Sequence, residues 1–180
     1  MRIVSGRYKR RIISPPGNLP VRPTTDMAKE SLFNILSNYI EFDGKTVLDL
    51  FAGTGNISYE FVSRGCGSVT AVDKDFGCIK FISSTAQKLD MKELVVTKMD
   101  VFRYIAVSKH KYDIIFADPP YQMNNIEDIS TQIFENNLLN QDGWLIVEHP
   151  AEIDFSGSLN FYEHRKYGRV NFSFFHVDTE

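Results

Sequence analysis

The chain has 180 residues, of which 43% are hydrophobic and 13% aromatic, and its formal net charge is −3. This size suits one domain with a single core. No apolar run approaches the ~18 residues of a membrane span, and the basic N-terminus lacks the apolar stretch of a signal peptide, so we expect a soluble, cytoplasmic protein. Its two cysteines, Cys66 and Cys78, form no ligand pattern, which predicts free thiols and no metal site.

Charge is distributed unevenly along the chain. Residues 1–30 carry seven Lys and Arg against two acids, whereas the other 150 residues have a net charge of −8. Residues 2–13 predict two short strands around Gly6, and a proline-rich linker follows, so we divide the chain into an arm (1–23) and a main domain (24–180). Such an arm can contact nucleic-acid phosphates, although a solvated charged surface explains the charges equally well. The candidate RNA-binding residues are Arg2, Arg7, Lys9, Arg10, Arg11 and Arg22.

The remaining elements alternate between strands and helices. A helix capped by Thr25 runs to Tyr39, with one apolar face. Further helices are predicted at 57–64, 76–89 and 102–107 and within 126–139, and strands at 46–50, 68–73, 94–100, 112–116, 144–148, 159–164 and 170–177. This order predicts an α/β fold, with a mostly parallel seven-stranded sheet covered on both faces and an antiparallel pair at the C-terminus.

Carboxylates stand at or near the carboxyl ends of four predicted strands: Asp49, Asp73, Asp100 and Asp118. An open α/β sheet binds ligands outside these ends. Each carboxylate alone is more often a helix cap or a surface charge, but four in register indicate one crevice. Asp73 can accept hydrogen bonds from both ribose hydroxyls, and Asp100 can accept one from an adenine amine.

A glycine loop, Phe51-Ala-Gly-Thr-Gly55, follows the first of these strands. A nicotinamide dinucleotide would require a third glycine where Ser58 stands, and Asp49 already precedes the loop. S-adenosylmethionine carries no phosphate, so the loop would instead receive its amino-acid group and sulfonium. The pattern Asp49-x-Phe51-x-Gly53-x-Gly55 resembles the first motif of methyltransferases, and together with Asp118-Pro-Pro-Tyr121 this resemblance favours a methyltransferase over a dehydrogenase.

Ala117-Asp-Pro-Pro-Tyr121 follows the fourth buried strand. Neither proline has an N–H, so the loop is rigid and accepts hydrogen bonds. Its natural partner is an exocyclic amine on a flat base, with Asp118 and the Pro119 carbonyl taking the two protons while Tyr121 stacks on the ring. The simpler interpretation is that Pro-Pro ends a strand and Asp118 caps the next helix.

Asp118-Pro-Pro-Tyr121 resembles the catalytic motif of amino-methyltransferases. Together with Arg22-Pro-Thr-Thr-Asp26, Val47-Leu-Asp-Leu-Phe-Ala-Gly-Thr-Gly55 and Lys166-Tyr-Gly168, it makes nearly the whole chain similar to the RsmD family of bacterial 16S ribosomal RNA guanine-N2 methyltransferases. The resemblance implies a Rossmann-like domain that uses S-adenosylmethionine to methylate one guanine of 16S rRNA. We expect a metal-independent monomer acting on free RNA or on an assembling small subunit.

The resemblance also implies roles for individual residues. Asp118, Pro119, Pro120 and Tyr121 would meet the target amine. The implied cofactor residues are Asp49, Phe51, Gly53 and Gly55 at the methionine part, Asp73 at the ribose and Asp100 near the adenine, with Thr25, Ala52, Thr54, Asn56, Lys74 and Val101 beside them. Thr54 replaces a common serine, and Met27 and Lys29 stand where the family often has arginines, which weakens a phosphate-contacting role for this helix.

Two further alternatives stay open. An adenine-N6 methyltransferase acting on DNA or RNA shares the tetrapeptide, but this chain has no room for a separate target-recognition domain. A non-catalytic RNA-binding module would use the basic arm, yet it would not need Asp118-Pro-Pro-Tyr121 beside a complete cofactor loop.

Overall fold

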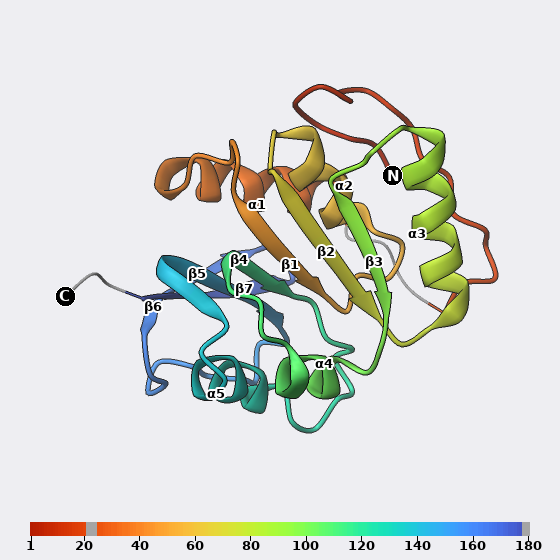
Figure 1. Ribbon diagram of the computed structural model, residues 1–180. Coiled ribbons are helices and arrows are strands. Elements are labelled where there is room, and N and C mark those ends of the chain that lie inside the picture. The colour runs from red at the N-terminus through yellow and green to blue at the C-terminus, as the bar shows by residue number, and fades with distance from the viewer. Residues whose placement is uncertain (21–24, 178–180) are drawn as a thin grey trace.

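The computed structural model describes residues 1–20 and 25–177, and its strands form one seven-stranded sheet in the order β3-β2-β1-β4-β5-β7-β6 (Figure 1). The strands are β1 (Thr46–Leu50), β2 (Ser68–Asp73), β3 (Leu94–Lys98), β4 (Tyr112–Ala117), β5 (Leu139–His149), β6 (Phe161–Tyr167) and β7 (Val170–His176). The helices are α1 (Asp26–Tyr39), α2 (Asn56–Ser63), α3 (Phe76–Lys88), α4 (Val101–Val107) and α5 (Glu127–Glu135).

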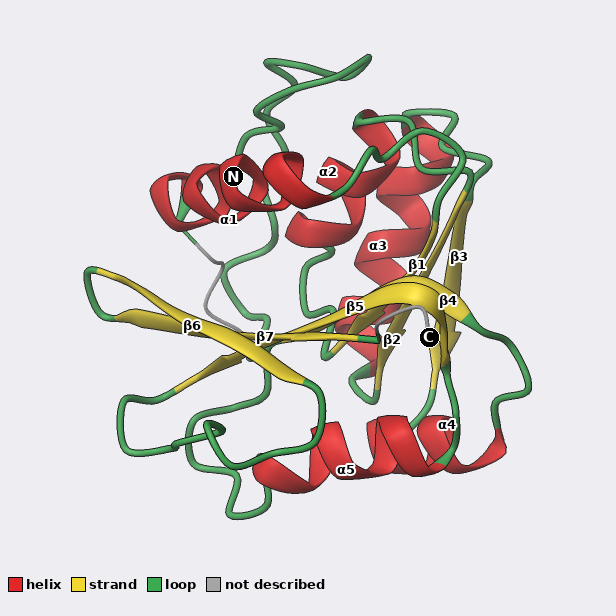
Figure 2. Ribbon diagram, turned by 90° about the vertical axis from the view of Figure 1, so that its left-hand side faces the viewer, coloured by secondary structure: helices red, strands yellow, loops and turns green. Residues whose placement is uncertain are grey.

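The sheet is parallel from β3 to β5, and β7 and β6 continue it in antiparallel pairing. Helices α1, α2 and α3 cover one face, and α4 and α5 cover the other (Figure 2). This three-layer arrangement confirms the predicted α/β class and the antiparallel pair at the C-terminus. Strands β5 and β3 differ from the prediction only in length, since β5 begins at Leu139 and β3 ends at Lys98.

The two faces of the sheet build two hydrophobic clusters. Val47, Ile114 and Phe116 belong to the cluster under α1, α2 and α3, whereas Leu48 and Ile115 belong to the cluster under α4 and α5. Alternate residues of a strand point to opposite faces, so a residue's position in this alternation decides which helices it meets.

The N-terminal arm forms a hairpin with a single β-bridge, Arg2 to Ile12, in place of the two predicted strands. Some of its backbone amides bond across the hairpin, such as Ile3 to the Arg11 carbonyl at 3.0 Å, and others bond to α2. Val4 and Ser5 donate to the Glu60 carboxylate at 2.8 and 3.0 Å, and Arg7 donates to the Ser63 carbonyl at 2.8 Å. The hairpin therefore lies along α2 as part of the folded body.

None of the helices within residues 1–20 and 25–177 is long and apolar enough to cross a membrane. Within the same ranges, no group of three or more His, Cys, Asp or Glu side chains is placed to hold a metal ion.

Candidate active site

Strand register brings three acidic residues to the centre of one sheet edge. Asp49 pairs with Phe116, and Ala117 pairs with Val147, so Asp118 and Glu148 are the next neighbours on adjacent parallel strands. By the alternation of side chains along a strand, all three acids point to the same face of the sheet as Phe116, which is the face covered by α1, α2 and α3. Of the four carboxylates predicted to line one crevice, register brings Asp49 and Asp118 together here, and Glu148 joins them.

The glycine loop turns sharply between β1 and α2. Gly55 has φ +79°, and a Cβ atom there would lie 2.8 Å from the ring of Tyr59. Phe51 and Gly53 also have positive φ, at 59° and 55°. The loop is held to β2 because the Ala52 amide donates to the Val72 carbonyl at 3.0 Å. This geometry brings the backbone of the loop to the edge where the acids meet.

Asp73 ends β2 and orders the loop. One carboxylate oxygen accepts from the Gly53 amide and the other from the Asp75 amide, both at 2.8 Å. Each carboxylate oxygen can accept a further bond, so this arrangement leaves acceptor capacity for ribose hydroxyls. Asp100 instead caps α4 by accepting from the Arg103 amide at 3.1 Å, and its side chain is exposed.

Asp118 and the two prolines form the loop predicted to receive the target amine. The Pro120 carbonyl accepts from the Met123 amide at 2.9 Å, whereas no described backbone amide donates to the Pro119 carbonyl. Pro119 is buried and Asp118 is partly exposed. The Pro119 carbonyl next to the Asp118 carboxylate thus has no backbone donor among the described residues, which leaves it available as an acceptor.

Tyr121 is anchored by a residue that the motif analysis missed. Its hydroxyl donates to Oε1 of Glu148 at 3.0 Å, while 42% of Tyr121 is exposed. Glu148 ends the apolar run of β5 and is only 6% exposed. The available signal was a carboxylate at the carboxyl end of a buried parallel strand, the same signal that identified Asp73 and Asp118.

Burial raises the pKa of every acid in this cluster. Asp49 is 2% exposed and accepts from the Ser58 hydroxyl, and burial, reinforced by the charge of Asp73, raises its pKa to about 7. Burial, together with the charges of Glu148 and Asp49, holds the pKa of Asp118 well above its ordinary value. Burial also raises the pKa of Glu148.

No lysine or arginine is among the groups that shift the pKa values of Asp49, Asp118 and Glu148 in the described part of the chain. An acidic cluster without a cation suits a positively charged ligand. S-adenosylmethionine carries a sulfonium and an ammonium group, so the residues present fit this cofactor.

Several residues predicted to bind the cofactor have structural partners. Thr25 caps α1 by accepting from the Ala28 amide at 3.2 Å. Asn56 begins α2, and its side-chain oxygen accepts from the Lys29 ammonium at 2.9 Å. Thr54 is buried, and its hydroxyl lies 3.6 Å from the sulfur of Met1. Lys74 is exposed, and Val101 is buried at the start of α4.

Lys29 is fully buried between the arm and α2. Its ammonium also donates to the Arg2 carbonyl and lies 3.5 Å from Glu60. This position excludes contact between Lys29 and an external phosphate. Lys29, which stands where the family often has an arginine, therefore has a structural role in this chain, since it links the arm to α2.

The arm residues predicted to bind RNA divide into three groups. Arg2 lies 3.8 Å from Asp26 and Arg7 lies 2.6 Å from Glu93, so both are ion-paired. Lys9, Arg10 and Arg11 are exposed and form no ion pair within the described residues; Arg22 lies outside those residues. The tip of the hairpin contacts Ser63, the last residue of α2. The glycine loop precedes the other end of this helix, about 12 Å away along the helix axis.

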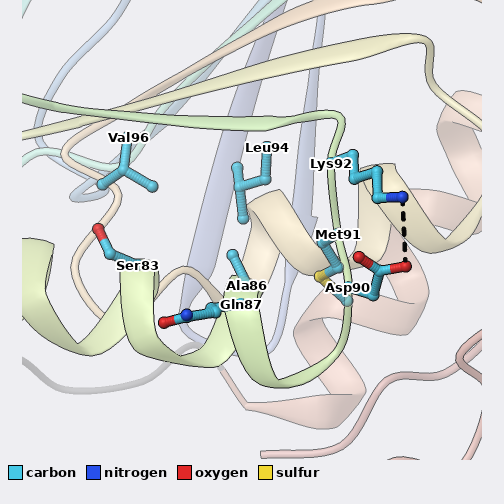
Figure 3. Close-up of a pocket in the computed structure, with 8 residues that line it drawn as sticks. All are labelled: Ser83, Ala86, Gln87, Asp90, Met91, Lys92, Leu94 and Val96. Atoms are coloured by element: carbon cyan, nitrogen blue, oxygen red, sulfur yellow. Dashed lines mark ion pairs between the residues drawn. The ribbon is translucent and has the colours of Figure 1, made fainter.

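An open groove lies between α3 and β3 (Figure 3). Its lining includes Ala86, Met91 and Leu94 and the ion pair of Lys92 with Asp90, 3.7 Å long. None of the predicted site residues lines it. The groove therefore has no part in the candidate site.

The fold and the site together define a Rossmann-like methyltransferase. The family model described as "Conserved hypothetical protein 95" matches residues 1–176. The chain belongs to this family, the RsmD family of rRNA methyltransferases.

Two relatives and two solved structures illustrate the similarity. The chain is 37% identical over 158 residues to "Putative rRNA methyltransferase YlbH" of Bacillus subtilis, covering 86% of this chain and 85% of that one. It is 30% identical over 148 residues to ribosomal RNA small subunit methyltransferase D of Escherichia coli, covering 82% and 71%. The structure of "Putative methyltransferase yhhF" from Escherichia coli has TM-score 0.86 at 24% identity, covering 100% and 99%. A 16S rRNA N2 methyltransferase of T. thermophilus, RsmC, in complex with AdoMet and guanosine, has TM-score 0.70 at 19% identity, covering 88% and 45%.

Proposed function

We propose that this protein transfers a methyl group from S-adenosyl-L-methionine to the N2 amine of one guanine in 16S ribosomal RNA. The observation that carries the proposal is the rigid loop of Asp118 and Pro119 at the central edge of the sheet, beside the buried Glu148. Such a loop accepts the two protons of an exocyclic amine. Membership of a family of rRNA methyltransferases supports RNA as the substrate.

The residues that would hold the cofactor are those of the glycine loop together with Asp49 and Asp73. Asp73 would accept from the ribose hydroxyls, and Asp49 would face the positively charged methionine part. The cofactor supplies a methyl group already activated by its sulfonium. Asp100 and Val101, at the start of α4, are the proposed boundary of the adenine site.

Asp118 is the proposed catalytic residue. Its carboxylate and the Pro119 carbonyl would orient the target nitrogen, and the carboxylate would stabilise the positive charge that develops on it. The target base must leave its stack to reach the loop, and the half-exposed ring of Tyr121 would offset part of that cost by stacking. The proton would leave to solvent after transfer.

The decisive experiment uses unmodified 16S RNA, small-subunit particles and DNA, each incubated with the protein and labelled S-adenosylmethionine. After digestion, the labelled nucleoside is identified. We expect N2-methylguanosine from RNA or particles only. N6-methyladenosine as the sole product would show instead that the protein is an adenine methyltransferase, and cofactor binding without turnover on any substrate would favour a binding module.

The same experiment identifies the working substrate. Labelling of particles but not of free RNA would assign the reaction to an assembling subunit, in the bacterial cytoplasm. Light scattering of the active protein would test the expected monomer.

A further inference from the structure

Glu148 has one carboxylate oxygen with a partner and one without. Oε1 accepts from the Tyr121 hydroxyl at 3.0 Å. Oε2 is buried and has no hydrogen-bond partner among the described residues. A buried carboxylate oxygen without a partner is costly, and folded proteins satisfy nearly all such atoms. The free oxygen therefore suggests a partner that arrives with a ligand.

The position of Glu148 identifies which ligand this is. Val147 pairs with Ala117 across the sheet, so Glu148 stands next to Asp118 on the adjacent strand and on the same face. Tyr121, which follows the two prolines, bonds to the same carboxylate. Glu148 thus lies beside the loop that is proposed to receive the target base.

Guanine differs from adenine and cytosine at a ring nitrogen beside the amine. Guanine carries N1–H next to its N2 amine, so it presents two adjacent donors to a protein. Adenine and cytosine carry an acceptor nitrogen beside the amine, which a carboxylate repels. Enzymes that extrude a base read this edge by hydrogen bonds, and bonds to a charged acceptor are the strong ones.

We propose that Glu148 determines specificity for guanine, with Oε2 accepting the N1–H proton while Asp118 and the Pro119 carbonyl hold the N2 amine. The inference rests on the proposed function and adds the residue that selects the base. It also explains why a carboxylate, rather than an apolar side chain, stands at this buried position, one residue before the end of β5.

The test compares guanine with 2-aminopurine, which keeps the N2 amine but has no proton on N1. Small-subunit RNA is ligated from synthetic fragments that carry either base at the modified position, and kcat/KM is measured for both RNAs. The wild-type protein is expected to prefer guanine by roughly 10²-fold, the scale of one well-placed pair of base contacts. Glu148→Gln offers an amide N–H to the bare N1 of 2-aminopurine, so the preference is expected to fall at least about tenfold.

Tyr121→Phe is the matched control. It removes the hydroxyl that bonds Oε1 and leaves both the carboxylate and the aromatic ring. We expect lower turnover on both RNAs with the preference for guanine retained. A purely structural role of Glu148 in holding Tyr121 predicts the same result for Glu148→Gln.

Equal losses on both RNAs in Glu148→Gln would therefore overturn the assignment. Should that variant fail to fold, Glu148→Asp keeps the charge but withdraws the carboxylate by one methylene. Its preference for guanine over 2-aminopurine is also expected to fall, and an unchanged preference would refute the role of Glu148 in selecting the base. If the wild-type protein methylates neither base, the proposed function itself fails and the assignment of Glu148 fails with it, whereas methylation of both bases at equal rates contradicts Glu148 alone.

Discussion

Helix α2 contacts two buried charged clusters, and in only one of them do opposite charges within the described residues pair with each other. At its N-terminal half, Ser58 bonds to Asp49, which lies with Asp118 and Glu148 at the carboxyl edge of the sheet. At its C-terminal half, Glu60 is fully buried between Lys29 and Arg64. We refer to the first as the edge cluster and to the second as the arm junction.

The arm junction satisfies its charges internally. The Glu60 carboxylate accepts from two backbone amides of the arm and from Arg64, and it faces Lys29. The edge cluster has raised pKa values and one carboxylate oxygen without a partner within the described residues. Buried charges that cost stability persist where function requires them. The difference supports a structural role for the arm junction and agrees with the proposed catalytic role of the edge cluster.

Breaking the arm junction should give the largest change. Lys29→Met removes the cation that faces Glu60 and leaves a buried carboxylate with Arg64 as its remaining charged partner. We expect the free energy of unfolding to fall by about 3 to 5 kcal/mol, the scale for removing one member of a buried pair. Urea unfolding measures it, with the exposed Lys80→Met on α3 as the control, expected within about 0.5 kcal/mol of wild type. A loss below about 1 kcal/mol for Lys29→Met would show that the junction is not the anchor of the arm.

Removing a buried charge from the edge cluster should instead raise the free energy of unfolding. The folded protein binds the Asp49 proton more tightly than the unfolded chain, because burial raises this pKa from 3.8 to about 7. The contribution of Asp49 to stability is therefore complete below pH 3.8 and is lost as the pH rises through 7. Asp49→Asn removes the buried charge, so the variant should be the more stable protein at pH 8.

The shift in the pKa of Asp49 sets an upper limit of roughly 4 kcal/mol on that gain. Unfolding of the cofactor-free variant and wild type at pH 5 and pH 8 tests it, since every other acid is the same in both proteins. The difference between the two proteins should grow from pH 5 to pH 8. A difference independent of pH would contradict the raised pKa of Asp49.

Removing the carboxylate of Asp118, the proposed catalytic residue, separates chemistry from binding within the edge cluster. Asp118→Ala should lower kcat by roughly 10² to 10³, the effect of losing one preorganised electrostatic contact. The cofactor Kd should change little, because the glycine loop and Asp73 are intact. Asp128→Ala, an exposed acid in the first turn of α5, is the control and should keep wild-type kcat. Normal turnover by Asp118→Ala would remove this residue from the mechanism.

The smallest effect is expected at the tip of the arm. Replacing Lys9, Arg10 and Arg11 by glutamine should flatten the slope of log K for RNA against log salt by at most about 2, at about 0.7 per lost phosphate contact on single-stranded RNA. The control replaces the exposed Lys80, Lys88 and Lys109 in the same way. Parallel slopes for the tip variant and wild type would show that these three cations are only a solvated surface.

The sequence by itself determined the order of elements, the α/β class and the central motif. These features are local: alternation of apolar residues sets a strand, a glycine sets a turn, and two prolines make a loop rigid wherever it lies. The predicted strand ends also placed Asp49, Asp73 and Asp118 at one edge, because parallel strands end on the same side.

Only the tertiary structure decided the roles of Glu148, Lys29 and the arm. Tyr121 and Glu148 are 27 positions apart in sequence, as are Lys29 and Asn56. No local pattern states that the second member of each pair is buried against the first. Lys29 has a structural role because α1, α2 and the arm bury its side chain. Glu148 joins the candidate site because register sets it beside Asp118. Burial and register are properties of the packed chain, and they decide whether a charge is balanced or left for a ligand.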